Sequence, residues 1–302
     1  MKKLVVLFVL VICFSCKNDS KSNGKLNVVT TTSMITDLVK NIGGDHINLQ
    51  GLMGSGVDPH LYKASEGDVT KLVNANVIFY NGLHLEGKLV EVFEKMGTAT
   101  KTPIALGDVL DKSTLIGSDY FASSYDPHVW FDIDYFRQFT KKVTQVLSEK
   151  DPDNAANFRA NERAYLLRLE NLQSRITTII ETLPRDKRIL VTAHDAFNYF
   201  GKAYDFEVVG LQGLSTATEA GVQDVQNLST FIIENNIKAI FVESSVPKRT
   251  IEALQAAVIS KGHEVAIGGT LYSDALGNAG TVEGTYVGMF EYNVNTIVNA
   301  LK

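Results

Sequence analysis

The sequence contains the tripeptide Asp-Pro-His twice, at residues 58–60 and 126–128. Proline fixes its own φ angle and disfavours helix for the residue before it, so each tripeptide should form a stiff, non-helical turn. Such a turn holds the imidazole that follows in one position, which is what a metal ligand requires. The repeat therefore predicts that His60 and His128 belong to one shared site.

Two further side chains, His194 and Asp274, are candidates to complete this site. Three neutral imidazoles and one carboxylate form a set of nitrogen and oxygen ligands that suits zinc or manganese. Four protein ligands of this kind would give a closed or nearly closed tetrahedral shell. A lone histidine after a strand is more often a hydrogen-bonded loop residue, so the prediction rests on the repeated tripeptide and on all four residues together.

The acidic residues beside these histidines have more than one interpretation. Asp58 and Asp126 could accept the free N–H of a ligand imidazole, or they could cap the turns that proline opens. We favour the turn role for both. Asp195 is expected to act as the N-cap of a helix that begins at residue 196.

The remaining histidines are weaker candidates. His84 follows a predicted strand and could line the site, whereas His46 and His263 are expected to be exposed. Four aromatic residues are expected to pack around the site and to exclude water from it: Trp130, Phe131, Tyr199 and Phe200.

The candidate ligands are positioned by an alternation of short β-rich runs with longer helical runs, which predicts an α/β fold with mainly parallel sheets. The predicted strands are residues 26–30, 47–52, 77–80 and 103–105, then 189–192, 207–211, 239–242 and 264–267. His60, His128, His194 and Asp274 all fall at or beyond the carboxyl ends of these strands. Open α/β sheets bind their ligands at that edge.

One amphipathic stretch, residues 151–183, is long for a helix of a globular domain, so we interpret it as a rigid link between two lobes. The predicted organisation is a signal peptide and tether (1–24), an N-terminal (β/α) lobe (25–150), the linking helix (151–183) and a C-terminal (β/α) lobe (184–302). Other predicted helices include 33–42 and 65–74, with Ser33 and Ser65 as N-caps. The lobes would face each other across a metal-binding cleft.

The first residues have the pattern of a targeting signal, because Lys2 and Lys3 precede an apolar stretch too short to span a bilayer. The stretch ends at a small residue followed by Cys16, which resembles a lipobox whose cysteine receives a lipid. A plain signal peptide is the alternative. Both cysteines lie in this leader, so the mature fold is expected to contain no disulfide and no thiol ligand.

The composition is that of ordinary globular protein, with 45% hydrophobic and 21% charged residues among 302. The formal net charge of −5 and the lack of Lys/Arg clusters argue against a nucleic-acid partner. A cationic or neutral ligand is more compatible with this balance.

The two Asp-Pro-His motifs, together with the segments 192–197, 210–213, 243–245 and 273–275 in the same order, resemble the TroA-type metal-binding lipoproteins of zinc and manganese ABC transporters. The resemblance covers nearly the whole mature chain. It implies two lobes joined by one rigid helix, with metal bound between them by His60, His128, His194 and Asp274. It also implies an ABC permease as partner, a monomeric protein, and a lipid anchor at Cys16 in the periplasm or at the cell surface.

The resemblance leaves the choice of metal open. Manganese-type relatives often have Glu where His194 stands, whereas specialised zinc importers carry a histidine-rich insertion before the second motif, and residues 113–125 contain no histidine. Three imidazoles favour zinc over manganese. Because a rigid linking helix limits hinge bending, we expect metal release through small tilts of the lobes and movement of loops.

Two other classes of function are alternatives. A secreted zinc hydrolase would use three protein ligands, a bound water and a general base, for which Glu243 is the nearest candidate. There is no His-Glu-x-x-His motif, and a fourth ligand is predicted. A surface adhesin would use the outer faces of the lobes, where the sequence indicates no apolar or aromatic patch.

Overall fold

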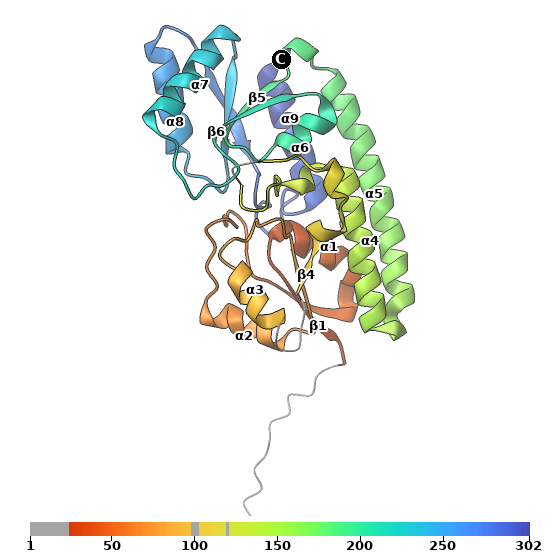
Figure 1. Cartoon of the computed structure of the whole chain (residues 1–302). Coiled ribbons are helices and arrows are strands. Elements are labelled where there is room, and N and C mark those ends of the chain that lie inside the picture. The colour runs from red at the N-terminus through yellow and green to blue at the C-terminus, as the bar shows by residue number, and fades with distance from the viewer. Residues whose placement is uncertain (1–23, 98–102, 119–120) are drawn as a thin grey trace, which may run out of the picture.

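The computed structural model describes residues 24–97, 103–118 and 121–302, which form two lobes beside a pair of long helices (Figure 1). The predicted signal, Cys16 and the tether up to residue 23 lie outside the described residues. Among the residues that are described, no helix combines the length and the apolar character needed to cross a membrane. The expected α/β fold, with two lobes and a long helix between them, is confirmed.

The N-terminal lobe is built on a four-stranded sheet in the order β2-β1-β3-β4, and every neighbouring pair is parallel. Its strands are β1 (Leu26–Thr30), β2 (Ile47–Gly51), β3 (Val77–Tyr80) and β4 (Ile104–Ala105). Its helices are α1 (Ser33–Gly43), α2 (Glu66–Asn74) and α3 (Val90–Gly97).

Of the two N-caps predicted for helices of this lobe, one is confirmed and the other is wrong. Ser65 caps α2 as predicted, and Asp68 completes a capping box. Ser33 does not cap α1, because Thr32 takes that place. The Ser33 hydroxyl instead accepts a hydrogen bond from the backbone N–H of Leu276 in the other lobe, at 2.8 Å. A residue expected to serve its own helix therefore joins the lobes.

The C-terminal lobe contains two parallel strand pairs, β5-β6 and β7-β8, with β5 beside β7. Its strands are β5 (Ile189–His194), β6 (Glu207–Gln212), β7 (Ala239–Glu243) and β8 (Ala266–Leu271). Its helices are α6 (Asn198–Tyr204), α7 (Val222–Glu234), α8 (Arg249–Ser260) and α9 (Tyr286–Leu301).

The position predicted for the last strand, residues 264–267, was wrong at both ends. The strand runs from Ala266 to Leu271 and includes Gly268 and Gly269. Glycine has poor strand propensity, so the sequence did not indicate that the strand continues past residue 267. Both glycines are required by packing: a Cβ on Gly268 would lie 2.7 Å from the Cβ of Ala300 in α9, and Gly269 has a φ of +148°. Contacts of the strand with α9 therefore determine its sequence.

Two long helices lie side by side, α4 (Ile133–Lys150) and α5 (Ala155–Glu181), and α5 runs along both lobes (Figure 1). Helix α5 starts later than predicted because residues Pro152–Asn154 form a 3₁₀ turn. It packs against α1 and α4 on the side of the N-terminal lobe and against α9 of the C-terminal lobe. Helix α5 is thus the element that links the two lobes, and α4 supports it on the side of the N-terminal lobe.

The lobes share one continuous hydrophobic core that includes residues of α1, α4, α5, α6 and α9. Helix α5 contributes a buried stripe at helical spacing: Phe158, Tyr165, Leu169, Leu172, Ile176 and Ile180. Polar contacts reinforce this core. The half-buried Asp37 carboxylate in α1 accepts the backbone N–H of Tyr286, the first residue of α9, at 3.0 Å. Separating the lobes would expose both the core and these groups.

We expect Leu169→Ala to lower the free energy of unfolding by about 2–5 kcal/mol, since it leaves a cavity in this shared core where Leu169 is 0% exposed. Urea unfolding followed by circular dichroism measures the change. Leu167→Ala is the matched control on the same helix, because Leu167 is 60% exposed and should cost less than about 0.5 kcal/mol. Equal losses in the two variants would contradict the assigned orientation of α5.

Candidate metal centre

The structure brings all four predicted ligands together. One ligand atom from each of His60, His128, His194 and Asp274 lies within 4.8 Å of the corresponding atom of every other. His60 Nε2 is 3.3 Å from His128 Nε2, and His194 Nε2 is 3.2 Å from Asp274 Oδ2. These distances leave room for one shared cation between them.

Each ligand comes from the carboxyl end of a strand region, as expected. His60 follows β2, His128 precedes the 3₁₀ turn Val129–Phe131, His194 is the last residue of β5, and Asp274 follows β8. The N-terminal lobe supplies the first two residues and the C-terminal lobe the other two. Metal bound here would therefore contact both lobes.

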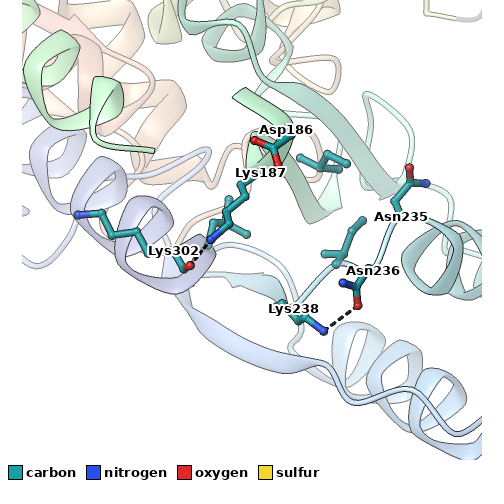
Figure 2. A pocket seen from close by; sticks show the side chains of 9 residues that line it. Asp186, Lys187, Asn235, Asn236, Lys238 and Lys302 are labelled. Atoms are coloured by element: carbon teal, nitrogen blue, oxygen red, sulfur yellow. Dashed lines mark hydrogen bonds between the residues drawn. The ribbon is translucent and has the colours of Figure 1, made fainter. Parts of the chain in front are cut away.

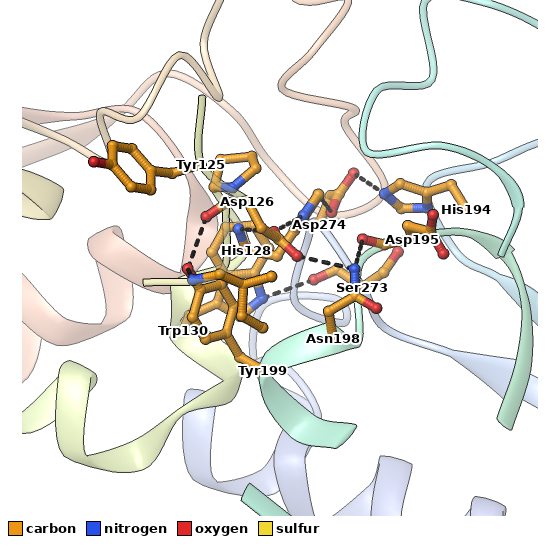
Figure 3. Close-up of polar contacts among 12 residues, drawn as sticks. Tyr125, Asp126, His128, Trp130, His194, Asp195, Asn198, Tyr199, Ser273 and Asp274 are labelled. Carbon is orange, nitrogen blue, oxygen red and sulfur yellow. Dashed lines mark hydrogen bonds and ion pairs between the residues drawn. The ribbon is translucent and has the colours of Figure 1, made fainter. Parts of the chain in front are cut away.

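The group is almost completely removed from solvent. His128 and His194 are 0% exposed, Asp274 1% and His60 5%. Figure 3 shows Asp274 between His128 and His194, with Asp126 and Asn198 beside them. The four side chains thus form a buried group between the lobes.

Several buried polar atoms here lack a hydrogen bond of good geometry. Among the described residues they include both ring nitrogens of His194 and both carboxylate oxygens of Asp274. His194 nevertheless lies at ion-pair distance from two carboxylates, with Nδ1 2.6 Å from Glu243 Oε2 and Nε2 3.2 Å from Asp274 Oδ2. Burying such atoms without partners costs free energy. A divalent cation would satisfy His194 Nε2 and the Asp274 oxygens, while His194 Nδ1 faces Glu243, so the donor set fits a metal.

The pKa values of these groups show how the cluster is balanced. Burial lowers the pKa of His60 to about 3, so this ring is neutral at physiological pH. Burial alone would also lower the pKa of His194, but the carboxylates of Glu243 and Asp274 outweigh it and hold that pKa well above its ordinary value. Burial would raise the pKa of Asp274, yet the nearby imidazoles, His194 first, hold it well below its usual range.

Asp126 has a larger role than the turn support that we favoured. Its Oδ1 accepts the backbone N–H of His128 at 2.9 Å and also lies 2.7 Å from Nδ1 of the same ring. Asn198 of the other lobe donates to Oδ2 at 3.0 Å (Figure 3). The turn role is present, and so is the contact that orients the imidazole; sequence spacing alone could not distinguish them.

Glu243, expected from the sequence only as a candidate general base, contacts the ring of His194. The last residue of β7, it lies 2.6 Å from His194 Nδ1 through Oε2, and its Oε1 accepts the His194 backbone N–H at 2.8 Å. The available signal was an acidic residue directly after the apolar run of a buried strand, at the same sheet edge as His194.

The other polar predictions have mixed outcomes. Asp58 accepts the backbone N–H of His60 at 2.8 Å, which confirms its turn role. Asp195 does not cap α6, whose N-cap is Phe197; its Oδ1 accepts the Gly210 N–H instead and ties β5 to β6. The Asp195 side chain thus stabilises the β5-β6 pair instead of the start of α6.

The remaining histidines are not part of the four-residue group. His84 is exposed, and Phe121 lies between it and His60, with ring centroids 6.2 and 6.4 Å away respectively. His46 and His263, expected to be exposed, are only partly so.

Of the four aromatic residues expected around the site, Trp130 and Tyr199 contact its residues, Phe131 packs against Trp130, and Phe200 packs in the core against Phe206 and Phe290. The Trp130 ring meets His128 edge-on with centroids 5.3 Å apart, and its Nε1 donates to the backbone oxygen of Ser273, next to Asp274. The Tyr199 hydroxyl donates to the backbone oxygen of Asp126 at 3.1 Å. These rings exclude water and also position the loops that carry the ligands.

A separate hollow of about 340 Å³ lies in the C-terminal lobe, near the end of the chain (Figure 2). Two of its three lysines donate hydrogen bonds to neighbouring groups, Lys187 to the backbone oxygen of Lys302 and Lys238 to the side chain of Asn236. It contains none of the four grouped ligands.

The sequence is similar to a protein-family model and to known metal-binding proteins. A family model described as "Zinc-uptake complex component A periplasmic" (ZnuA) matches residues 28–300. The zinc-binding protein TroA of Treponema pallidum is 48% identical over 283 residues, with 94% of this chain and 91% of the relative covered. The manganese-binding lipoprotein MntA of Bacillus subtilis is 46% identical over 300 residues, with 98% and 97% covered.

A solved structure gives the same result. The periplasmic zinc-binding protein TroA from Treponema pallidum superposes with a TM-score of 0.89 at 48% identity, and the match covers 92% of this chain and 99% of that one. The sequence resemblance is therefore confirmed, and the chain belongs to the ZnuA family of metal-binding solute-binding proteins, in which TroA and MntA are among its relatives.

Proposed function

We propose that the protein is the extracytoplasmic solute-binding component of a metal ABC importer, which binds a divalent cation and delivers it to a membrane permease. His60, His128, His194 and Asp274 would hold the ion as cargo. The observation that carries the proposal is the enclosed group of three imidazoles and one carboxylate, buried between two lobes with unsatisfied donor atoms. Membership of the ZnuA family supports it.

Zinc is the favoured cargo and manganese the second candidate. Three imidazole nitrogens bind zinc more tightly than manganese, following the usual order of divalent ions. The printed names of similar proteins include both metals, zinc for TroA and manganese for MntA. Binding in the cell would also depend on which ion is available.

The arrangement supports binding rather than zinc hydrolysis. A catalytic zinc site keeps one coordination position open for water, whereas the group here offers four protein ligands. Glu243, the residue considered as a general base, is already in contact with His194 through one oxygen and with its backbone through the other. It is better placed to orient His194 than to activate water.

The leader and the domain boundaries complete the proposal. We infer that Cys16 carries a lipid and that residues up to 24 form the signal and a tether, which holds a monomeric protein at the membrane in the periplasm or at the cell surface. The N-terminal lobe would comprise residues 25–150, the link 151–183 and the C-terminal lobe 184–302. MntA, a relative of 46% identity, is named as a lipoprotein, which is consistent with such an anchor.

His128→Ala should weaken zinc binding by at least about 100-fold, because loss of a partner behind a ligand already costs about 10–100-fold. Competition titration with a chromogenic chelator measures the affinity for zinc and, separately, for manganese. In the unsubstituted protein we expect one ion per chain and tighter binding of zinc.

The matched control is His84→Asn, since His84 is exposed and has a φ of +62°, a conformation that asparagine tolerates. This variant should keep the affinity and stoichiometry of the unsubstituted protein. Unchanged zinc binding in His128→Ala would refute the assigned site.

Zinc affinity should fall as the pH falls. The raised pKa of His194 means that the metal-free protein carries a proton on this ring at neutral pH, and zinc must displace it. Below that pKa the affinity should therefore drop about tenfold per pH unit. His60, with a pKa of about 3, should contribute nothing above pH 5. Calorimetry in buffers of different ionisation enthalpy would count the released proton; a count of zero at pH 7 would contradict this charge balance.

Cys16→Ala should move the protein from the membrane fraction to the soluble extracytoplasmic fraction, because a lipidated cysteine is the only anchor that the proposal invokes. Fractionation followed by immunoblotting measures the distribution. Cys13→Ala is the control and should leave the protein on the membrane. Membrane retention of Cys16→Ala would argue against lipidation at this residue.

A further inference from the structure

The four ligands differ in how firmly the protein holds them. The ring of His128 is held through Nδ1 by Asp126, and the ring of His194 through Nδ1 by Glu243, with all four side chains 0% exposed. The contacts of the His60 ring with charged groups and histidines run through Nε2, toward His128 and Asp274. His60 is also the most exposed of the four ligands, at 5%.

His60 lies in the irregular segment between the end of β2 at Gly51 and the start of α2 at Glu66. Within this segment Asp58 fixes the backbone, because its Oδ1 accepts the His60 N–H at 2.8 Å. The position of His60 therefore depends on how the Asp58 carboxylate is itself held.

The second oxygen of Asp58 is held from the other lobe. The Thr216 hydroxyl donates to Asp58 Oδ2 at 2.5 Å, and Thr216 is only 9% exposed, so little water is available to replace this bond. A hydrogen bond from a hydroxyl to a carboxylate is among the stronger ones in proteins. It joins the His60 turn to the loop that follows β6.

The loop that carries Thr216 is fastened next to His194. Gln212, the last residue of β6, donates through Nε2 to the backbone oxygen of Thr218 at 3.0 Å. The backbone N–H of Asp195, which follows His194, donates to the oxygen of Gly213 at 3.3 Å. Thr216 thus connects a well-anchored part of the C-terminal lobe to the least firmly held ligand of the N-terminal lobe.

We propose that Thr216 is a positioning residue for the metal site: through Asp58 it holds His60 in place, and its hydroxyl controls how fast the ion leaves. The inference rests on the proposed function and adds that His60 is the ligand that detaches first. Release would then begin with the break of one hydrogen bond between lobes, while the shared core and helices α4 and α5 stay packed.

The test compares Thr216→Val, which keeps the shape but removes the hydroxyl, with Thr216→Ser, which keeps the hydroxyl. The full-length chain in detergent is loaded with zinc and mixed in a stopped-flow instrument with excess chromogenic chelator. Thr216→Val should release zinc about 10-fold faster than the unsubstituted protein, as expected for loss of one hydrogen bond to a carboxylate. Thr216→Ser should stay within about threefold.

A purely structural role is distinguished by two further measurements. The rise in unfolding temperature on adding zinc should be smaller for Thr216→Val than for Thr216→Ser. In a double-mutant cycle, Thr216→Val added to Asp58→Ala should change the release rate by less than about twofold, because the partner is already removed. Asp58→Ala alone should also speed release, which keeps the proposal testable if Thr216→Val does not fold.

The proposal is overturned if Thr216→Val releases zinc at the unsubstituted rate, if Thr216→Ser is as fast as Thr216→Val, or if the two substitutions act independently in the cycle. Failure of the proposed function is a different result, in which the unsubstituted protein itself binds neither zinc nor manganese.

Discussion

The removal of the Asp274 carboxylate from water is the constraint on which the rest of the structure depends. A carboxylate that is 1% exposed is costly unless an opposite charge accompanies it. In the metal-free protein the raised pKa of His194 supplies that charge as a proton, and a bound cation would supply it instead. A cation bound here would therefore compete with that proton.

This constraint explains why the lobes are pressed together. The ligands come from both lobes, and only close contact excludes water from all of them at once. The continuous core through α4, α5 and α9 and the bond from Tyr286 to Asp37 maintain that contact. Wide opening of the lobes would expose this core, so movement confined to loops is the less costly way to reach the site.

The sequence predicted the features that follow from local conformation or from the common edge of parallel strands. The Asp-Pro-His turns are local, and the carboxyl ends of parallel strands meet at one edge, so His60, His128, His194 and Asp274 could be grouped without coordinates. The features that the sequence did not predict depend on contacts between residues far apart in the chain. Glu243 and Asp126 contact specific ring nitrogens, which no spacing encodes. The extent of β8 depends on α9, whose approach requires Gly268 and Gly269.

The asymmetry among the three histidines has a chemical consequence. A carboxylate that accepts a hydrogen bond from the Nδ1–H of an imidazole fixes its tautomer and makes the opposite nitrogen a better metal ligand. Asp126 and Glu243 do so for His128 and His194, whereas Asp58 reaches only the backbone of His60. In the proposed site, His128, His194 and Asp274 would therefore retain the ion, and His60 would close the shell. A carrier that must both bind and release its cargo needs such a difference, because four equally firm ligands would leave no favourable first step for dissociation.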